Sequence, residues 1–79
     1  MKSPDEEFEG PVWRAVDGSP LSCREKIKVM NENLGELRQM AQDALEDGIL
    51  MGADEQQVRG VLLEIIEGLV NPYAKTGER

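Results

Sequence analysis

The chain has 79 residues, with nine Lys and Arg against sixteen Asp and Glu, and its formal net charge is −7 at pH 7. A surface this acidic repels phosphate, which disfavours binding to nucleic acids and to anionic membranes. One Cys and no His exclude an intrachain disulfide and the usual zinc sites, and no Gly-rich phosphate loop occurs. We therefore expect no catalytic, cofactor-binding or metal-binding residues.

Residues 1–20 are predicted to form an acidic and flexible arm in an extended conformation. Three Pro and two Gly interrupt regular structure, and five acidic residues against two basic ones oppose a packed core. The arm nevertheless holds Phe8 and Trp13, two of the three aromatic residues. Either these two form a linear motif for a partner, or Trp13 and Val12 fold back to cover the helix that follows. Both interpretations stay open, and we expect Trp13 to dock while Phe8 stays mobile.

The sequence also predicts where the protein resides. Its first residues lack the apolar segment of a secretory signal. No uninterrupted apolar run exceeds three residues, whereas a membrane span needs about 20. Because a single unpaired Cys suits a reducing compartment, we expect a cytoplasmic protein.

A long helix is predicted over residues 22–51. Ser22 and Glu25 fit a capping box at its start, and Ser19 is an alternative first cap. Gly52 fits a left-handed cap at its end.

Apolar residues along this helix recur at alternating spacings of three and four, the pattern of a helix that packs along another helix. This stripe consists of Ile27, Met30, Leu34, Leu37, Ala41, Ala44 and Gly48. Between Asn31 and Gly35, two Asn and one Gly lower the helix propensity. We expect a continuous helix, and a kink in this weak stretch is the alternative.

A second helix is predicted over residues 55–70. Asp54 and Gln57 fit its N-terminal cap, and a Pro two residues beyond its end stops it. Its broad apolar face is formed by Val58, Val61, Leu62, Ile65, Ile66 and Leu69. Gly60 and Gly68, both expected inside this helix, are either tolerated surface residues or a groove for another helix.

These elements predict an all-α fold, in which residues 21–73 form an antiparallel two-helix hairpin and residues 74–79 a disordered tail. At 1.5 Å per residue the first helix spans about 43 Å and the second about 24 Å, so the second cannot cover the bulky first half of the stripe. We expect a second copy of the chain, or a different protein, to cover that half. Two hairpins would then give a four-helix arrangement.

The function predicted from these features is that of a small, non-enzymatic protein-interaction module, such as a regulator, an assembly factor or a chaperone-like adaptor. Its predicted partners are a second copy of itself and an unidentified protein. The predicted interface consists of Phe8, Trp13, Ile27, Met30, Leu34, Leu37 and Ala41.

Two alternative functions come from other features. Cys23 lies at the predicted start of the first helix beside Arg24, where the helix dipole favours a thiolate, and this suggests a redox sensor. The simpler interpretation is that Cys23 is a small side chain that extends the stripe four residues before Ile27. The acidic surface also suggests a nucleic-acid mimic, although basic residues interrupt its carboxylates.

Overall fold

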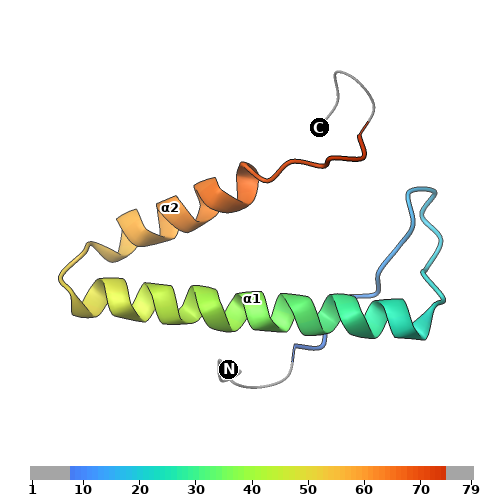
Figure 1. Ribbon diagram of the computed structural model, residues 1–79, viewed down its shortest axis with the longest axis horizontal. Coiled ribbons are helices and arrows are strands. Elements are labelled where there is room, and N and C mark those ends of the chain that lie inside the picture. Colours follow the sequence, from blue (N-terminus) through green and yellow to red (C-terminus); the bar gives the residue numbers. More distant parts are fainter. Residues whose placement is uncertain (1–7, 75–79) are drawn as a thin grey trace. The chain divides into compact units, whose positions relative to one another are not determined.

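The computed structural model describes residues 8–74, so the first seven residues of the predicted arm and residues 75–79 of the predicted tail lie outside it. Two α-helices follow one another along this range: α1, Arg24–Leu50, and α2, Glu55–Glu67 (Figure 1). No β-strand occurs in the described range. The predicted all-α fold with a two-helix hairpin is confirmed.

Two parts of the chain are compact by themselves, an N-terminal unit that ends at Ala44 and a C-terminal unit that starts at Leu45. α1 contributes its first part to one unit and its last part to the other. It runs without interruption for 27 residues, and the weak stretch Asn31–Gly35 is helical. The continuous helix that we expected is therefore observed, and the alternative kink is not.

The start of α1 differs from the prediction. The Cys23 carbonyl accepts the first helical hydrogen bond, from the Ile27 amide at 3.0 Å, so Cys23 and not Ser22 occupies the cap position. The Leu21 amide donates to the Trp13 carbonyl at 2.9 Å and so pairs the chain just before the helix with the arm. Because the Leu21 amide is used in this way and the Ser19 side chain bonds Asp17, the alternative cap at Ser19 is not formed.

The connection between the helices is a backbone motif that its sequence predicts. Gly52 has φ +97°, in the left-handed region that Gly enters without steric penalty. Its amide donates to the Ile49 carbonyl at 3.0 Å. The Ala53 amide donates to the Gly48 carbonyl at 2.9 Å. These two bonds form a Schellman motif, which ends α1 where we expected.

α2 begins at its predicted cap. Asp54 has an extended backbone, with φ −69° and ψ 130°, and its carboxylate accepts a hydrogen bond from the Gln57 amide at 2.9 Å. This bond satisfies one of the amides that a helix start leaves without a helical partner. The connection between the helices therefore consists of the C-terminal cap of α1 at Gly52, followed directly by the N-terminal cap of α2 at Asp54.

α2 ends at Glu67, three residues before the predicted end. Gly68 lies at the C-cap and donates its amide to the Glu64 carbonyl at 2.9 Å, so Gly68 is not an interior residue as we expected. After Gly68, the Leu69 amide donates to the Ile66 carbonyl at 3.2 Å, three residues back, so the helical pattern of bonds four residues back ends here. Beyond it, the Asn71 side chain accepts the Tyr73 amide at 2.8 Å and forms a turn around the predicted Pro break.

No residue between positions 8 and 74 is buried, so the described chain has no closed hydrophobic core. Large apolar side chains are exposed on both helices, with Met40 at 70%, Leu63 at 61% and Ile65 at 57%. A core in a chain this small is marginal alone, and such chains often add a disulfide, a metal or a partner. Neither described helix is long and apolar enough to cross a membrane.

Candidate interaction site

The arm of the N-terminal unit is more ordered than the extended segment that we predicted. A tight hairpin starts at Trp13 and ends at Leu21, whose amide bonds the Trp13 carbonyl. Inside it, the Ala15 amide donates to the Ser19 carbonyl at 2.7 Å. The tip is a three-residue loop that closes on Gly18, with φ +94°. A left-handed Gly is the usual end of such a loop, so Gly18 here builds a turn.

The Asp17 side chain fastens this turn. Its Oδ1 accepts the Ser19 hydroxyl at 2.6 Å and the Ser19 amide at 3.0 Å. Both donors favour the ionised carboxylate, and they lower the pKa of Asp17 below its ordinary value of 3.8. The Arg14 guanidinium also donates to the Gly18 carbonyl at 3.0 Å. Ser19 therefore serves the turn and not the helix cap that we considered for it.

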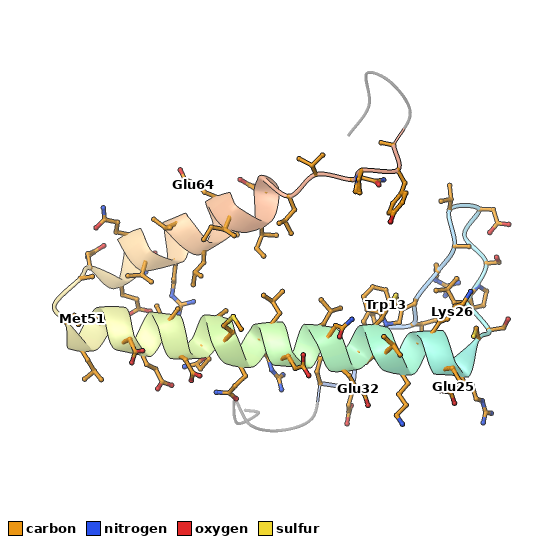
Figure 2. The ribbon with its side chains drawn as sticks, in the orientation of Figure 1. Trp13, Glu25, Lys26, Glu32, Met51 and Glu64 are labelled. Carbon is orange, nitrogen blue, oxygen red and sulfur yellow. The ribbon has the colours of Figure 1, made fainter. Side chains whose placement is uncertain are left out.

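Asn31, in the weak stretch of α1, holds the arm with both ends of its amide. Trp13 Nε1 donates to Asn31 Oδ1 at 2.8 Å, and Asn31 Nδ2 donates to the Glu9 carbonyl at 3.1 Å. Trp13 and Asn31 are both half-buried, and Figure 2 shows Trp13 beside the first turns of α1. Because this amide both donates and accepts, an Asp or an apolar side chain in its place loses at least one of the two bonds.

The arm crosses α1, entering on one side of the helix and leaving on the other (Figure 1). A Cβ on Gly10 would overlap Asn31 Oδ1 and would lie 3.2 Å from Cε2 of the Phe8 ring. Gly10 also has φ +73°, in the left-handed region. Gly alone meets both the steric and the conformational requirement, so Gly10 is part of the contact and not a linker residue.

Phe8 docks on the next turn of α1. A Cβ on Gly35 would lie 3.1 Å from the Phe8 Cβ, so the bare backbone of Gly35 gives the ring its place. The Arg38 guanidinium carbon lies 5.6 Å from the centre of the Phe8 ring, within cation–π range. We expected Phe8 to stay mobile, whereas the structure places it on α1 together with Trp13.

The residues of α1 that hold the arm are spaced by four and three and form one line along the helix, the arm-docking line: Asn31, Gly35 and Arg38. Each follows by one position a residue of the apolar stripe: Met30, Leu34 and Leu37. One residue turns a helix by about 100°, so these contacts lie beside the stripe and not on it. The stripe keeps a face of its own, on which Leu37 is 43% exposed.

The other predicted interface residues of α1 lie along that face. Those that are half-buried are Ile27, Met30, Leu34 and Ala41. The structure brings the aromatic residues and the stripe to adjoining faces of one helix, so the predicted interface falls into two parts.

Sequence reasoning missed the arm-docking line, although part of its signal was present. Relative to Ala, Gly35 costs a helix about 1 kcal/mol and Asn31 up to about 0.7 kcal/mol. In the structure both residues contact the arm, whereas from the sequence their low propensity indicated only a weak stretch in a continuous helix, with a kink as the alternative. Arg38, an ordinary surface residue for a helix, carries no such signal.

In the C-terminal unit, the end of α1 and the start of α2 approach closely at Gly48. A Cβ there would lie 3.0 Å from Val58 Cγ2, so this member of the stripe serves the hairpin itself. Val58 is half-buried, whereas Val61, Ile65 and Ile66 on the predicted apolar face are exposed. The hairpin contact therefore uses only part of that face.

Cys23 is exposed, so it is not packed as a small stripe residue. Within residues 8–74 no group of three or more Cys, Asp or Glu side chains could hold a metal ion. No family model, curated protein or solved structure matches the chain. What the protein does is therefore inferred from its own contacts and surfaces.

Proposed function

We propose that this chain is a small, acidic, non-enzymatic protein-interaction module of the cytoplasm, a regulator, assembly factor or chaperone-like adaptor. It pairs with a second copy of itself and presents further apolar surface to another protein. One observation carries this proposal: no residue between positions 8 and 74 is buried, while both helices expose large apolar side chains. Covering such surface is the main favourable term in protein association.

The apolar surface of α2 supports a contact beyond the hairpin. At 100° per residue, its apolar residues extend from Val61 through Val58 to Leu63 over about 200° of the helix. A helix that packs on one neighbour needs a stripe of about 100°. Val58 marks the side toward Gly48, and Leu63 lies about 140° from it and is 61% exposed. A helix of a partner would cover the apolar surface of α2 that the hairpin contact leaves exposed.

The stripe of α1 supports pairing in the N-terminal unit. Its three-and-four spacing fits a helix of a second copy packed along it, and the arm is held beside it. Leu37 faces away from the arm-docking line and is partly open to a partner. The bulky first half of the stripe is thus available while the arm is docked.

The charge of the chain defines the conditions under which it would pair. Each copy carries −7, so two copies repel one another and salt screens this repulsion. Self-association should therefore strengthen with ionic strength. A different partner with basic residues around its apolar contact would instead bind more weakly as salt rises.

Two charge insertions test the proposed pairing. Leu37→Asp places an unpaired carboxylate on the stripe and should weaken the dimer by several kcal/mol. Val29→Asp is the matched control, because it makes the same kind of change at a residue outside the stripe that is 52% exposed. Sedimentation should show monomer for the first variant and dimer for the second. Equal behaviour of both variants would reject the stripe as the pairing surface.

The exposure of Cys23 favours one further test, that of the redox alternative. In an antiparallel pair of α1 helices the two Cys23 residues lie tens of ångströms apart, too far for a disulfide. We expect mild oxidation to leave the dimer without a crosslink. Rapid and complete crosslinking would indicate a parallel pair and would favour a thiol-based sensor.

A further inference from the structure

We propose that docking of the arm segment Phe8–Trp13 and the helical state of α1 between Asn31 and Gly35 are coupled, so that the arm is a clasp. With the arm docked, the first half of the stripe is one rigid surface. With the arm released, this part of α1 opens. The coupling stands on the contacts of the N-terminal unit, and only its consequence for partner binding rests on the proposed function.

The weak stretch of α1 is where such a clasp has most effect. Three of its five residues are poor helix formers: Asn31, Asn33 and Gly35. Two of these three hold the arm, since Asn31 makes both side-chain hydrogen bonds and Gly35 lies under Phe8. The residues that weaken the helix are thus the ones that bind the arm.

The arm contacts need a helical backbone. Asn31, Gly35 and Arg38 form one line only when the chain between them is helical. An opened turn would move Gly35 and Arg38 away from Phe8 while Asn31 still held Trp13. The arm therefore binds the helical state more tightly, and by linkage the helical state is stabilised when the arm is bound.

The contacts of the clasp are individually weak, so the arm can detach. They include two hydrogen bonds to Asn31 and one cation–π contact to Arg38, and each net hydrogen bond changes an equilibrium constant by about tenfold or less. The weak stretch begins directly after Met30 of the stripe and contains Leu34. Opening it breaks their register, so a partner that needs both residues binds only the docked form.

Gly10→Ala is the sharpest way to release the arm, because a methyl group there overlaps Asn31 Oδ1. Gly18→Ala is the matched control. It also places Ala at a positive φ, +94° against +73°, but nothing lies within 4 Å of its Cβ. The control reproduces the backbone strain in the same arm without the overlap at α1.

Two measurements on the full chain test the coupling. Trp13 fluorescence reports docking, and amide hydrogen exchange compares residues 31–36 with residues 40–46 of the same helix. For Gly10→Ala we expect a red-shifted emission and at least tenfold faster exchange at 31–36. Gly18→Ala and the unchanged chain should keep a blue-shifted emission and slow exchange there. A released arm with unchanged exchange overturns the proposal, as does a solvent-exposed Trp13 in the unchanged chain or a docked Trp13 in Gly10→Ala.

If Gly10→Ala speeds hydrogen exchange along the whole of α1, a double variant decides whether the arm and the weak stretch are coupled. Adding Gly35→Ala raises helix propensity in the weak stretch and should restore slow exchange at 31–36 while Trp13 stays exposed. Failure to restore it overturns the coupling. None of these readouts needs a partner, so sedimentation of the same samples separates a failure of the clasp from a failure of the proposed pairing.

Discussion

Each of the two units of this chain has its own kind of internal contact. In the C-terminal unit, the helix connection rests on backbone bonds between residues five or fewer positions apart, such as Ala53 to Gly48 at 2.9 Å. In the N-terminal unit, the arm is held by side chains: Asn31 bonds Trp13 and Glu9, which are 18 and 22 positions away. The first unit to form during folding is therefore expected to be the C-terminal one.

The C-terminal unit is therefore expected to act as a stable scaffold, and the N-terminal unit is the part that can change its state. Local contacts close short loops at low entropic cost, and they form wherever their sequence signal occurs. The arm must close a longer loop and depends on one Asn amide, two Gly positions and two aromatic side chains. Changes in the C-terminal unit should therefore alter stability, whereas changes in the N-terminal unit should alter arm docking.

The largest effect is expected from Gly48→Leu, which tests the close approach of the hairpin. The Cβ alone would lie 3.0 Å from Val58 Cγ2, and the rest of the side chain must push α2 away. We expect a loss of about 2–3 kcal/mol in the free energy of unfolding, measured by denaturation followed by circular dichroism. Adding Val58→Ala should recover part of it, and Gly60→Leu should cause no loss. If Val58→Ala gives no recovery, the contact is not the cause.

Gly52→Ala and Gly60→Ala should change stability in opposite directions. Gly52 has φ +97°, so Ala there costs about 1–2 kcal/mol. Gly60 lies inside α2 with nothing within 4 Å of a Cβ, so Ala there should add up to about 1 kcal/mol. Thermal unfolding measures both, and Trp13 emission should stay constant throughout. A shift of that emission would show that the two units are not independent.

Asn31→Ala and Asn33→Ala test the arm in the same way. Both variants gain helix propensity, but only Asn31→Ala removes the hydrogen bonds to Trp13 and Glu9, which are worth about 1 kcal/mol each. We expect Asn31→Ala to red-shift Trp13 emission and Asn33→Ala to leave it unchanged while stabilising α1 by about 0.5 kcal/mol. Equal emission in the two variants would contradict the docking of Trp13 on Asn31.

The smallest effect concerns pH and the tip of the arm. The Ser19 hydroxyl and amide lower the pKa of Asp17 below 3.8, so the contribution of this carboxylate is complete above that pH. It is lost as pH falls through the lowered pKa of the folded turn. The Ser19 amide resonance should therefore titrate with a midpoint below 3.8. A midpoint at or above 3.8 would show that the turn does not hold the carboxylate.

The same contrast explains how much the sequence revealed. The end of α1 at Gly52 and the start of α2 at Asp54 were predicted, because each cap depends on residues within about one helical turn. The cap lies at Cys23, one residue beyond the predicted Ser22, and the Leu21 amide just before it bonds the Trp13 carbonyl, eight positions earlier, which the sequence did not indicate. The arm-docking line was missed for a similar reason: the low helix propensity of Asn31 is readable, but its partner lies far along the chain.

Sedimentation equilibrium of the unchanged protein shows whether the chain pairs through the apolar surface that it does not bury alone. We predict a folded helical species with twice the chain mass of 8.8 kDa at micromolar concentration, with the dimer strengthened by salt. A folded species with the mass of one chain at high micromolar concentration would contradict the proposed pairing.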